Sequence, residues 1–399
     1  MPAPVLITGG GIAGLAAALA LAQRGQASAV FERSSSFSEL GAGVQLGPNA
    51  TGVLAALGLL PAVQALACQP QALHIRAMHT GRSLSQWPLG AAMQQRYGQP
   101  YLCVHRGQLH QLLLQAAQAP KNQGLISLHS SASVQGFKQN AAEVELVFAH
   151  GAPAMGSALL ACDGVWSRLA PQINPQLRPA SYSGHMAYRA LVPMEQAQRL
   201  LPHVAQEVGV WLGRHAHVVH YPVDAGQQLN IVVLLEAPQP SAEQGWNQPI
   251  PHGEVQTELE RTLGQRQASA LQSLLWAADN WFAWALCGRA PQGGWAAGRA
   301  ALLGDAAHPM LPYLAQGAAM ALEDAWVLAQ HWQPDQAAAS LQQYAALRQA
   351  RCIRVVNTAA RNGRIFHASG PLAVARDAYL RLQHGRAMGL SWLYGWQKP

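Results

Sequence analysis

Three glycines near the start of the chain have the spacing that binds a pyrophosphate. Gly9, Gly11 and Gly14 form a GxGxxG pattern within GGGIAG at 9–14. Gly9 permits a tight turn, Gly11 lets a phosphate approach the backbone, and Gly14 lets the following helix lie close to a sheet. The unpaired N–H groups at the start of that helix would then donate hydrogen bonds to the phosphates.

The segments around these glycines make the prediction of a dinucleotide site specific. PVLIT at 4–8 predicts a strand, LAAALALAQRG at 15–25 a helix, and ASAVFER at 27–33 a second strand that reaches Glu32. A carboxylate at that position can accept hydrogen bonds from both hydroxyls of a ribose. FAD and NAD contain the same adenosine and pyrophosphate, so these residues do not choose between them.

Two later acidic turns could also contact a cofactor. ALLGDAAHPMLPYLAQGAAMALED at 301–324 predicts an apolar strand, a turn at Asp305, two prolines and a helix that begins near Gln316. ACDGVWSR at 161–168 places Asp163 after another apolar run.

Together these segments resemble the class A flavoprotein aromatic hydroxylases, the family of salicylate hydroxylase and 3-hydroxybenzoate 6-hydroxylase. The resemblance covers nearly the whole chain and continues in GAGVQLGPNA at 41–50, HRGQLH at 105–110, HVVHYPV at 217–223 and RNGRIFHASGPLA at 361–373. It implies bound FAD, NADH or NADPH as a transient electron donor, and hydroxylation of a small phenolic ring with O2. Hydroxybenzoate-like and hydroxypyridine-carboxylate-like rings are the implied substrates.

The resemblance also implies which residues bind FAD. Asp305 would hydrogen-bond the ribityl chain, and the backbone N–H groups of Gly317 and Ala318 would face the flavin edge where negative charge accumulates on reduction. The family's middle motif runs DGxxSxxR, and Ala170 stands where its arginine is expected. The full expected cofactor-binding set is Gly9, Gly11, Ala13, Gly14, Glu32, Arg33, Val44, Arg106, Asp163, Asp305, Gly317 and Ala318.

For the substrate, the resemblance points to His217 and Tyr221. Four residues apart on a strand, they share one face and lie roughly 13 Å apart along the backbone. Attack on the ring by a flavin C4a-hydroperoxide is electrophilic, so it is favoured when a ring hydroxyl loses its proton. We expect His217 to act as the base and Tyr221 to orient or relay the proton. Gln316 and the Pro309 carbonyl are expected to contact the substrate.

Other interpretations of these residues and of the function stay open. Taken alone, His217 is more often an ordinary half-buried strand histidine, Asp305 a helix cap, and Arg106 a surface ion pair. An FAD-dependent dehydrogenase or reductase on the same fold would transfer electrons without inserting oxygen. A flavin-binding protein without turnover is the third alternative.

The elements that position these residues predict an α/β chain: a Rossmann-like FAD-binding domain, an inserted substrate domain of mainly antiparallel sheet, and a C-terminal helical segment. The expected parts are 1–180 for FAD binding, with about 75–100 on the substrate side, 181–284 for the substrate domain, 285–345 for the second FAD-binding part, and 346–399 for the tail. Arg348, Arg351 and Arg354 at helical spacing predict a solvated face. Trp392, Tyr394 and Trp396 are expected to close over the core or to form a dimer contact.

The composition of the chain argues against several other classes of protein. The net charge of +7 comes from scattered basic residues, which does not suggest nucleic-acid binding. Five widely spaced cysteines without a CxxC pair suggest neither disulfides nor a metal site. With no apolar run of membrane-spanning length, we expect a cytoplasmic monomer or homodimer. The exact substrate, the ring position, the choice of NADH or NADPH and the effect of Ala170 are not given by the sequence.

Overall fold

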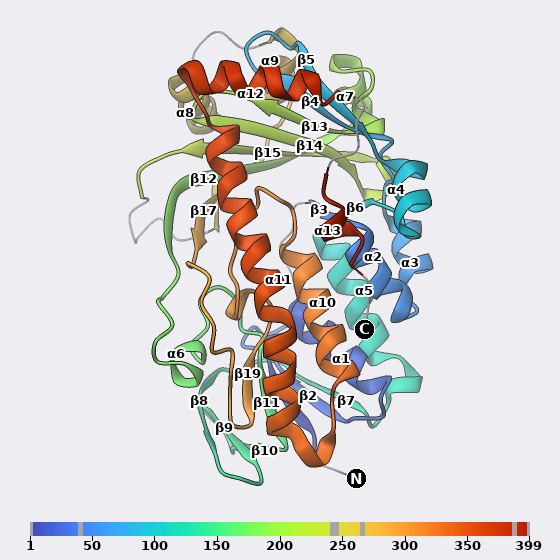
Figure 1. Ribbon diagram of the computed structural model, residues 1–399, viewed down its shortest axis with the longest axis vertical. Helices are drawn as coiled ribbons and strands as arrows, with labels where there is room; N and C mark the ends of the chain where they lie inside the picture. Colours follow the sequence, from blue (N-terminus) through green and yellow to red (C-terminus); the bar gives the residue numbers. More distant parts are fainter. Residues whose placement is uncertain (1–2, 39–42, 240–246, 264–267, 385–388, 397–399) are drawn as a thin grey trace.

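The computed structural model describes residues 3–38, 43–239, 247–263, 268–384 and 389–396. Two large β-sheets lie towards opposite ends of the molecule, and one long helix, α11 (Ala337–Phe366), runs between them (Figure 1). The mixed α/β class predicted from the sequence is confirmed.

The first sheet contains the strand that precedes the glycine loop. Its strands are parallel from β19 to β7, and they are buried along their length at β1, β2, β11 and β19. Burial on both faces explains why they read as continuous apolar runs. Helices α1 (Ile12–Ala22) and α10 (Gly317–Gln330) pack against each other beside this sheet. The strand order is β18 (Ala296–Ala297), β19 (Ala300–Leu302), β11 (Ala158–Ala161), β1 (Val5–Thr8), β2 (Ser28–Phe31) and β7 (Ile126–His129).

The second sheet has eight strands and carries the segment expected to face the substrate. The antiparallel arrangement holds except between β13 and β4, which are parallel. The run at 207–223 forms two strands, because the chain turns back at 213–215, where His215 has a φ of 58°. The order is β16 (Asn247–Ile250), β17 (Trp281–Gly288), β12 (Ser181–Pro193), β15 (Gln228–Glu236), β14 (Ala216–Val223), β13 (Glu207–Leu212), β4 (Ala72–Ala77) and β5 (Ser83–Pro88).

The two faces of β14 have different surroundings. Ala216 and Val218 pack into the core of this sheet with its covering helices, whereas Val219 and Tyr221 pack towards the first sheet's core. His217 shares the second face, as the alternation predicted. His215 does not belong to this alternation, because it precedes the strand.

Smaller elements complete the described chain. Two further sheets are formed by β3 (Gly43–Leu46) with β6 (Leu102–His105), and by β8 (Val134–Gln139), β9 (Val144–Phe148) and β10 (Ala154–Gly156). Other helices are α2 (Pro48–Ala56), α3 (Leu60–Leu66), α4 (Gly90–Tyr97), α5 (Arg106–Gln118), α6 (Ala170–Ile173), α7 (Met194–Leu200), α8 (His252–Leu263), α9 (Ser269–Trp276), α12 (Gly370–Leu382) and α13 (Ser391–Tyr394).

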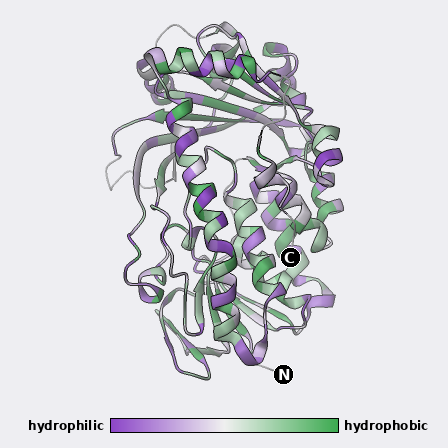
Figure 2. Ribbon diagram, viewed as in Figure 1, coloured by the Kyte–Doolittle hydropathy of each residue, from purple (hydrophilic) through white to green (hydrophobic). Residues whose placement is uncertain are grey.

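The arginine stripe of α11 is not a solvated face, and that prediction was wrong for two of its three members. Arg348 is buried and forms ion pairs of 2.7 Å with Glu323 and Asp324 of α10. Arg351 pairs with Glu323 at 2.7 Å, while Arg354 is exposed. Hydrophilic and hydrophobic residues alternate along α11 (Figure 2). Arg348 and Arg351 form its ion pairs with α10.

The aromatic tail closes over the core. Tyr394 is buried, and Trp392 and Trp396 pack against the same core. The guanidinium of Arg354 lies 3.9 Å from the centroid of the Trp392 ring, a cation–π contact.

The domain boundaries stay predictions. The chain enters the eight-stranded sheet at β12 and leaves it after β17, while β4 and β5 join that sheet from an earlier part of the chain. Helix α11 continues without a break between residues 345 and 346. Over the described ranges, no helix combines the length and apolarity that a membrane crossing requires.

We expect the protein to lose stability in mild acid because His220 is buried. Neither ring nitrogen has a hydrogen-bond partner among the described residues, and burial lowers the pKa of His220 to about 4. The unfolded chain, with a histidine pKa of about 6.5, therefore binds a proton that the folded chain does not. The free energy of unfolding should fall by about 1.5 kcal/mol from this group between pH 6.5 and 5.

Urea unfolding of the FAD-saturated protein at these two pH values measures the effect. His220→Phe keeps a ring of similar size and should show a smaller loss of stability. An identical pH dependence in both proteins would contradict the assignment to His220.

Candidate active site

The glycine loop is built for a close approach of its backbone to a ligand. Gly9 has a φ of 92°, and a Cβ at Gly14 would overlap the carbonyl oxygen of Gly9. Gly11 is the N-cap of α1; among the described residues no side chain caps this helix, and its first turn contains no acidic residue. The N–H groups at its start are therefore available to an anionic ligand.

The carboxylate of Glu32 lies directly beside this loop. Its two oxygens accept hydrogen bonds from the backbone N–H groups of Gly10, at 2.8 Å, and Ser34, at 2.9 Å. Arg33 is exposed next to it. His110 of α5 reaches the loop from another side, with Nε2 2.7 Å from the Gly10 carbonyl oxygen. Arg106 lies one turn before His110 on the same helix, so the two share a face.

The turn at Asp305 meets the start of α10. A Cβ built at Gly317 would lie 4.0 Å from Oδ1 of Asp305, and one at Gly304 would lie 3.0 Å from Cβ of Ala13. This places the turn against the start of α1. The N-cap of α10 is Gln316, and in the described structure no side chain caps this helix either. Just before it, Ala315 has a φ of 51°, a strained conformation for a residue other than glycine.

Asp163 and Val44 are the remaining residues expected to bind the cofactor. Oδ2 of Asp163 accepts a hydrogen bond from the Arg168 N–H at 3.0 Å, while its buried Oδ1 has no hydrogen-bond partner in the part of the chain described. Burial raises the pKa of Asp163. Ala170 is buried at the start of α6. The guanidinium of Arg168 donates a hydrogen bond of 2.8 Å to Oε1 of Gln135. Val44 pairs with Val104 across β3 and β6; Gly41 and Ala42 of its motif lie outside the described residues.

These groups fit FAD. Two uncapped helix starts face the same region as two carboxylates, Glu32 and Asp305, and glycines keep the approach free of side chains. The unpaired oxygen of Asp163 is a buried acceptor that a ligand donor would satisfy. FAD has the groups that complement them: phosphates, the hydroxyls of its ribose and ribityl chain, and a ring edge that accepts electrons.

His217 lies in the wall of a cavity of about 1380 Å³. Its Nδ1 is 2.8 Å from Nε2 of His367, and its ring packs within 5.3 Å of Phe366 and 5.4 Å of Tyr313, measured between centroids. Burial, with His367 and His185 nearby, lowers the pKa of His217 well below its usual value. The ring is therefore neutral. His367 holds Nδ1, and the ring lines the cavity, so Nε2 is the nitrogen that a ligand in the cavity could reach.

Tyr221 is placed differently from His217. It is buried against Gly43 and is not among the described residues that line the cavity. Burial raises its pKa, which keeps the phenol neutral, and Gln45 is its hydrogen-bonding neighbour. Gln45 also accepts a hydrogen bond of 2.6 Å from the Tyr101 hydroxyl and does line the cavity.

The loop after Asp305 forms another part of the cavity wall. Pro312, Tyr313, Leu314 and Ala315 line it, whereas Pro309 and Gln316 are buried beside it. Oε1 of Gln316 accepts a hydrogen bond of 3.0 Å from Asn49.

Sequence reasoning missed several polar residues of this site. His367 lies 150 positions from His217, and no local pattern connects the two. Asn49 and Gln45 belong to a motif that was recognised without assigning them a role. Arg189 of β12 lies on the same sheet face as Val219, through the register of both with Val232. The alternation of side chains along HMAYRALVP at 185–193 could have identified Arg189 as a residue on this sheet face.

The sequence of the chain matches a known family and several curated relatives. A family model described as FAD binding domain matches residues 2–359. The chain is 35% identical over 403 residues to 3-hydroxybenzoate 6-hydroxylase of Polaromonas naphthalenivorans (strain CJ2), covering 98% of this chain and 96% of the relative. It is 32% identical over 334 residues to 6-hydroxynicotinate 3-monooxygenase of Pseudomonas fluorescens, covering 82% and 81%.

Solved structures of other proteins have a fold similar to that of this chain. The fold matches HpxO of Klebsiella pneumoniae in complex with FAD and uric acid with a TM-score of 0.84 and 26% identity, over 96% of this chain and 93% of that one. It matches a salicylate hydroxylase substrate complex with a TM-score of 0.83 and 25% identity, over 99% and 96%.

Proposed function

The chain belongs to the FAD binding domain family of class A flavoprotein aromatic hydroxylases, and on this premise we propose that it hydroxylates a small phenolic ring carrying a carboxylate, with O2 and NADH or NADPH as co-substrates. One observation supports this activity above the alternatives. A buried neutral histidine, His217, faces a large cavity with one ring nitrogen available. Such a base serves the activation of a phenol and has no evident use in electron transfer alone.

When bound, FAD would supply the redox chemistry, that is, acceptance of a hydride and activation of oxygen. The start of α10 and Asp305 would hold its ring and ribityl chain, while the glycine loop and Glu32 would hold its phosphates and ribose. Dipoles fixed in the fold at the start of α10 stabilise negative charge without needing to reorient.

His217 would accept the proton of the ring hydroxyl at Nε2. A free phenol has a pKa of about 10, so a neutral base close to it is needed for ionisation near neutral pH. The hydrogen bond at Nδ1 holds the imidazole in one orientation, as a second group does in many base-assisted sites. Tyr221 would orient the neighbouring Gln45 as a neutral hydrogen-bonding group, since its raised pKa disfavours ionisation.

The side of the cavity nearest His217 would limit the access of water to the reacting ring. Apolar strand residues and the rings of Phe366 and Tyr313 surround His217, and Pro312 lines the same cavity. Exclusion of water strengthens each polar interaction in the site and limits side reactions of activated oxygen. Lining residues near the sheet are Leu73, Ile75, Val208, Val210 and Val219.

Arg189 supports an anionic substituent on the substrate. Its guanidinium packs 4.9 Å from the Trp284 ring, and its Nε is buried without a hydrogen-bond partner in the described structure. Burial lowers its pKa, and Arg106 adds a second positive charge nearby. No described acidic side chain forms an ion pair with Arg189. A carboxylate would complement this region, since buried guanidinium groups are normally paired.

The reaction is tested by offering phenolic acids to the FAD-loaded protein. We expect 3-hydroxybenzoate, salicylate or 6-hydroxynicotinate to stimulate NADH or NADPH oxidation and O2 uptake, and to be recovered with one added oxygen atom. Benzoate is the matched control, because it has the carboxylate without the ring hydroxyl and should give no hydroxylated product.

Two outcomes would contradict the proposal. Stimulated nicotinamide oxidation without oxygen in any product would favour the dehydrogenase or reductase alternative. Failure of both nicotinamides to reduce the flavin, with every acid tested, would favour a flavin-binding protein without turnover. The five free cysteines fit a reducing compartment, and we place the reaction in the cytoplasm.

A further inference from the structure

We propose that His367 and Glu236 form a proton path that leads from His217 to solvent. The proton removed from the substrate hydroxyl would leave the cavity through these side chains instead of through the cavity mouth. This inference rests on the proposed role of His217 as the base.

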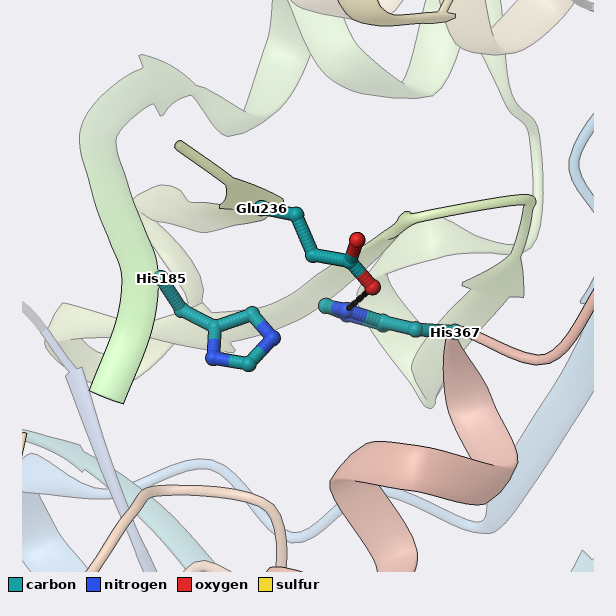
Figure 3. A group of neighbouring side chains, drawn as sticks. All are labelled: His185, Glu236 and His367. Carbon is teal, nitrogen blue, oxygen red and sulfur yellow. Dashed lines mark ion pairs between the residues drawn. The ribbon is translucent and has the colours of Figure 1, made fainter. Parts of the chain in front are cut away.

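The three side chains follow one another from the cavity wall to the surface. Nδ1 of His217 lies 2.8 Å from Nε2 of His367, within hydrogen-bond distance. Nδ1 of His367 lies 3.6 Å from Oε1 of Glu236, beyond hydrogen-bond distance, and has no hydrogen-bond partner among the described residues. A small rotation of the partly exposed Glu236 side chain would complete this second contact. The side chains of His217 and His367 are almost fully buried, whereas that of Glu236 is 42% exposed. Figure 3 shows His367 and Glu236 directed towards each other.

Backbone hydrogen bonds hold the path in place. His367 is the C-cap of α11, and its N–H donates to the Gly363 carbonyl at 3.1 Å. The N–H of His215 donates to the His367 carbonyl at 3.3 Å, and the N–H of Glu236 donates to the His215 carbonyl at 3.0 Å. The end of α11, the turn before β14 and the end of β15 are therefore tied together.

The proton steps balance along this series. His217 accepts the substrate proton at Nε2 and releases its Nδ1 proton to Nε2 of His367. His367 then releases its own Nδ1 proton to the carboxylate of Glu236, which exchanges it with water. Both imidazoles begin neutral, because burial lowers the pKa of His217 well below its usual value and that of His367 to about 3.

Other titratable groups also face His367. The ring of His185 lies 5.0 Å away between centroids, and the ring of Tyr313 lies 5.8 Å away. His215 occupies the other oxygen of Glu236 at 2.7 Å. Groups that influence His367 from the packed elements are His185 of β12, His215 and His217 beside and within β14, Glu236 of β15, Tyr313 of the proline loop and Arg376 of α12.

Variants at His367 test the path in the FAD-loaded enzyme, with whichever phenolic acid the wild-type enzyme hydroxylates. His367→Gln can still hydrogen-bond to His217 but cannot pass a proton on, so we expect hydroxylation to slow by about 10²-fold. Flavin reduction by the nicotinamide should keep its wild-type rate. Added imidazole should accelerate His367→Ala, and the pH dependence of hydroxylation in Glu236→Gln should differ from wild type. His150→Ala, an exposed histidine far from this path in the sequence, serves as the control for unspecific effects of imidazole.

The outcomes separate this inference from the proposed function. A wild-type hydroxylation rate and pH profile in His367→Gln, together with a slow His217 variant, would overturn the path and leave the base assignment intact. A wild-type rate in the His217 variant would overturn the base assignment itself. Failure of imidazole to accelerate His367→Ala, with folding shown to be intact by FAD content, would also count against the path.

Discussion

Replacing His217 with phenylalanine is expected to lower the yield of hydroxylated product by about 10²- to 10⁴-fold, the range by which a positioned general base accelerates a reaction. Phenylalanine keeps the ring contacts with Phe366 and Tyr313 but cannot accept a proton. FAD content and flavin reduction should remain near wild type, so nicotinamide oxidation would continue and lead mainly to hydrogen peroxide. The measurement is the ratio of hydroxylated product to nicotinamide oxidised.

Val219→Ala is the matched control for the change at His217. Val219 lies two residues further on the same strand face and also lines the cavity, but it has no titratable group. We expect its product ratio to stay within a few-fold of wild type. An unchanged ratio in His217→Phe would remove His217 as the base and direct attention to Tyr221.

Substitution of Gly14 by alanine is expected to weaken the binding of FAD by up to about 150-fold. The added Cβ would overlap the backbone carbonyl oxygen of Gly9 and would lie 3.3 Å from Cγ2 of Ile7. Neither the backbone of the phosphate loop nor the buried strand can move aside cheaply. Overpacking of this kind costs about 1–3 kcal/mol or more, which corresponds to a loss in affinity of up to about 150-fold. Titration of the apoprotein with FAD, followed by flavin fluorescence, measures the change.

Gly25→Ala provides the matched control at the other end of α1. Gly25 has a φ of 71°, and within the described structure no atom lies within 4 Å of a Cβ built on it. The variant should lose about 1 kcal/mol of stability through backbone strain and bind FAD as wild type does. Equal FAD affinity in Gly14→Ala and wild type would show that the close packing of α1 on the loop does not govern cofactor binding.

The cofactor region could be predicted from the sequence because its chemistry is local. The glycines, Glu32 and Asp305 each stand in a short strand–turn–helix segment whose backbone geometry depends on nearby residues. The first sheet was predictable for a similar reason, since strands buried on both faces read as continuous apolar runs.

The environment of the expected base could not be predicted in the same way. His217 was placed on the correct face of β14 by alternation, yet its partner His367 is the C-cap of a helix and lies 150 positions later. Only the tertiary fold brings the two together. The parallel pairing of β13 with β4 was missed for the same reason, because β4 comes from a distant part of the chain.

Arg348 shows how a local pattern can mislead. Arginines at helical spacing usually cover a solvated face, but here Glu323 and Asp324 offer buried carboxylates on the adjacent helix. The favourable pairing is visible only once α10 and α11 are known to be neighbours. Buried charges that are fully paired in this way fix how two helices sit against each other.

The number of residues in α11 fixes the distance and the rotation between its contact with α10 and its contact with His217. Arg348 is tied to the helix that begins at Gly317, and His367 stands 19 residues later, roughly 28 Å along the same axis at 1.5 Å per residue. Adding or deleting one residue between them would rotate His367 by about 100° and direct its imidazole away from His217. The helix therefore tolerates substitution on its outer side far better than any change in its residue count.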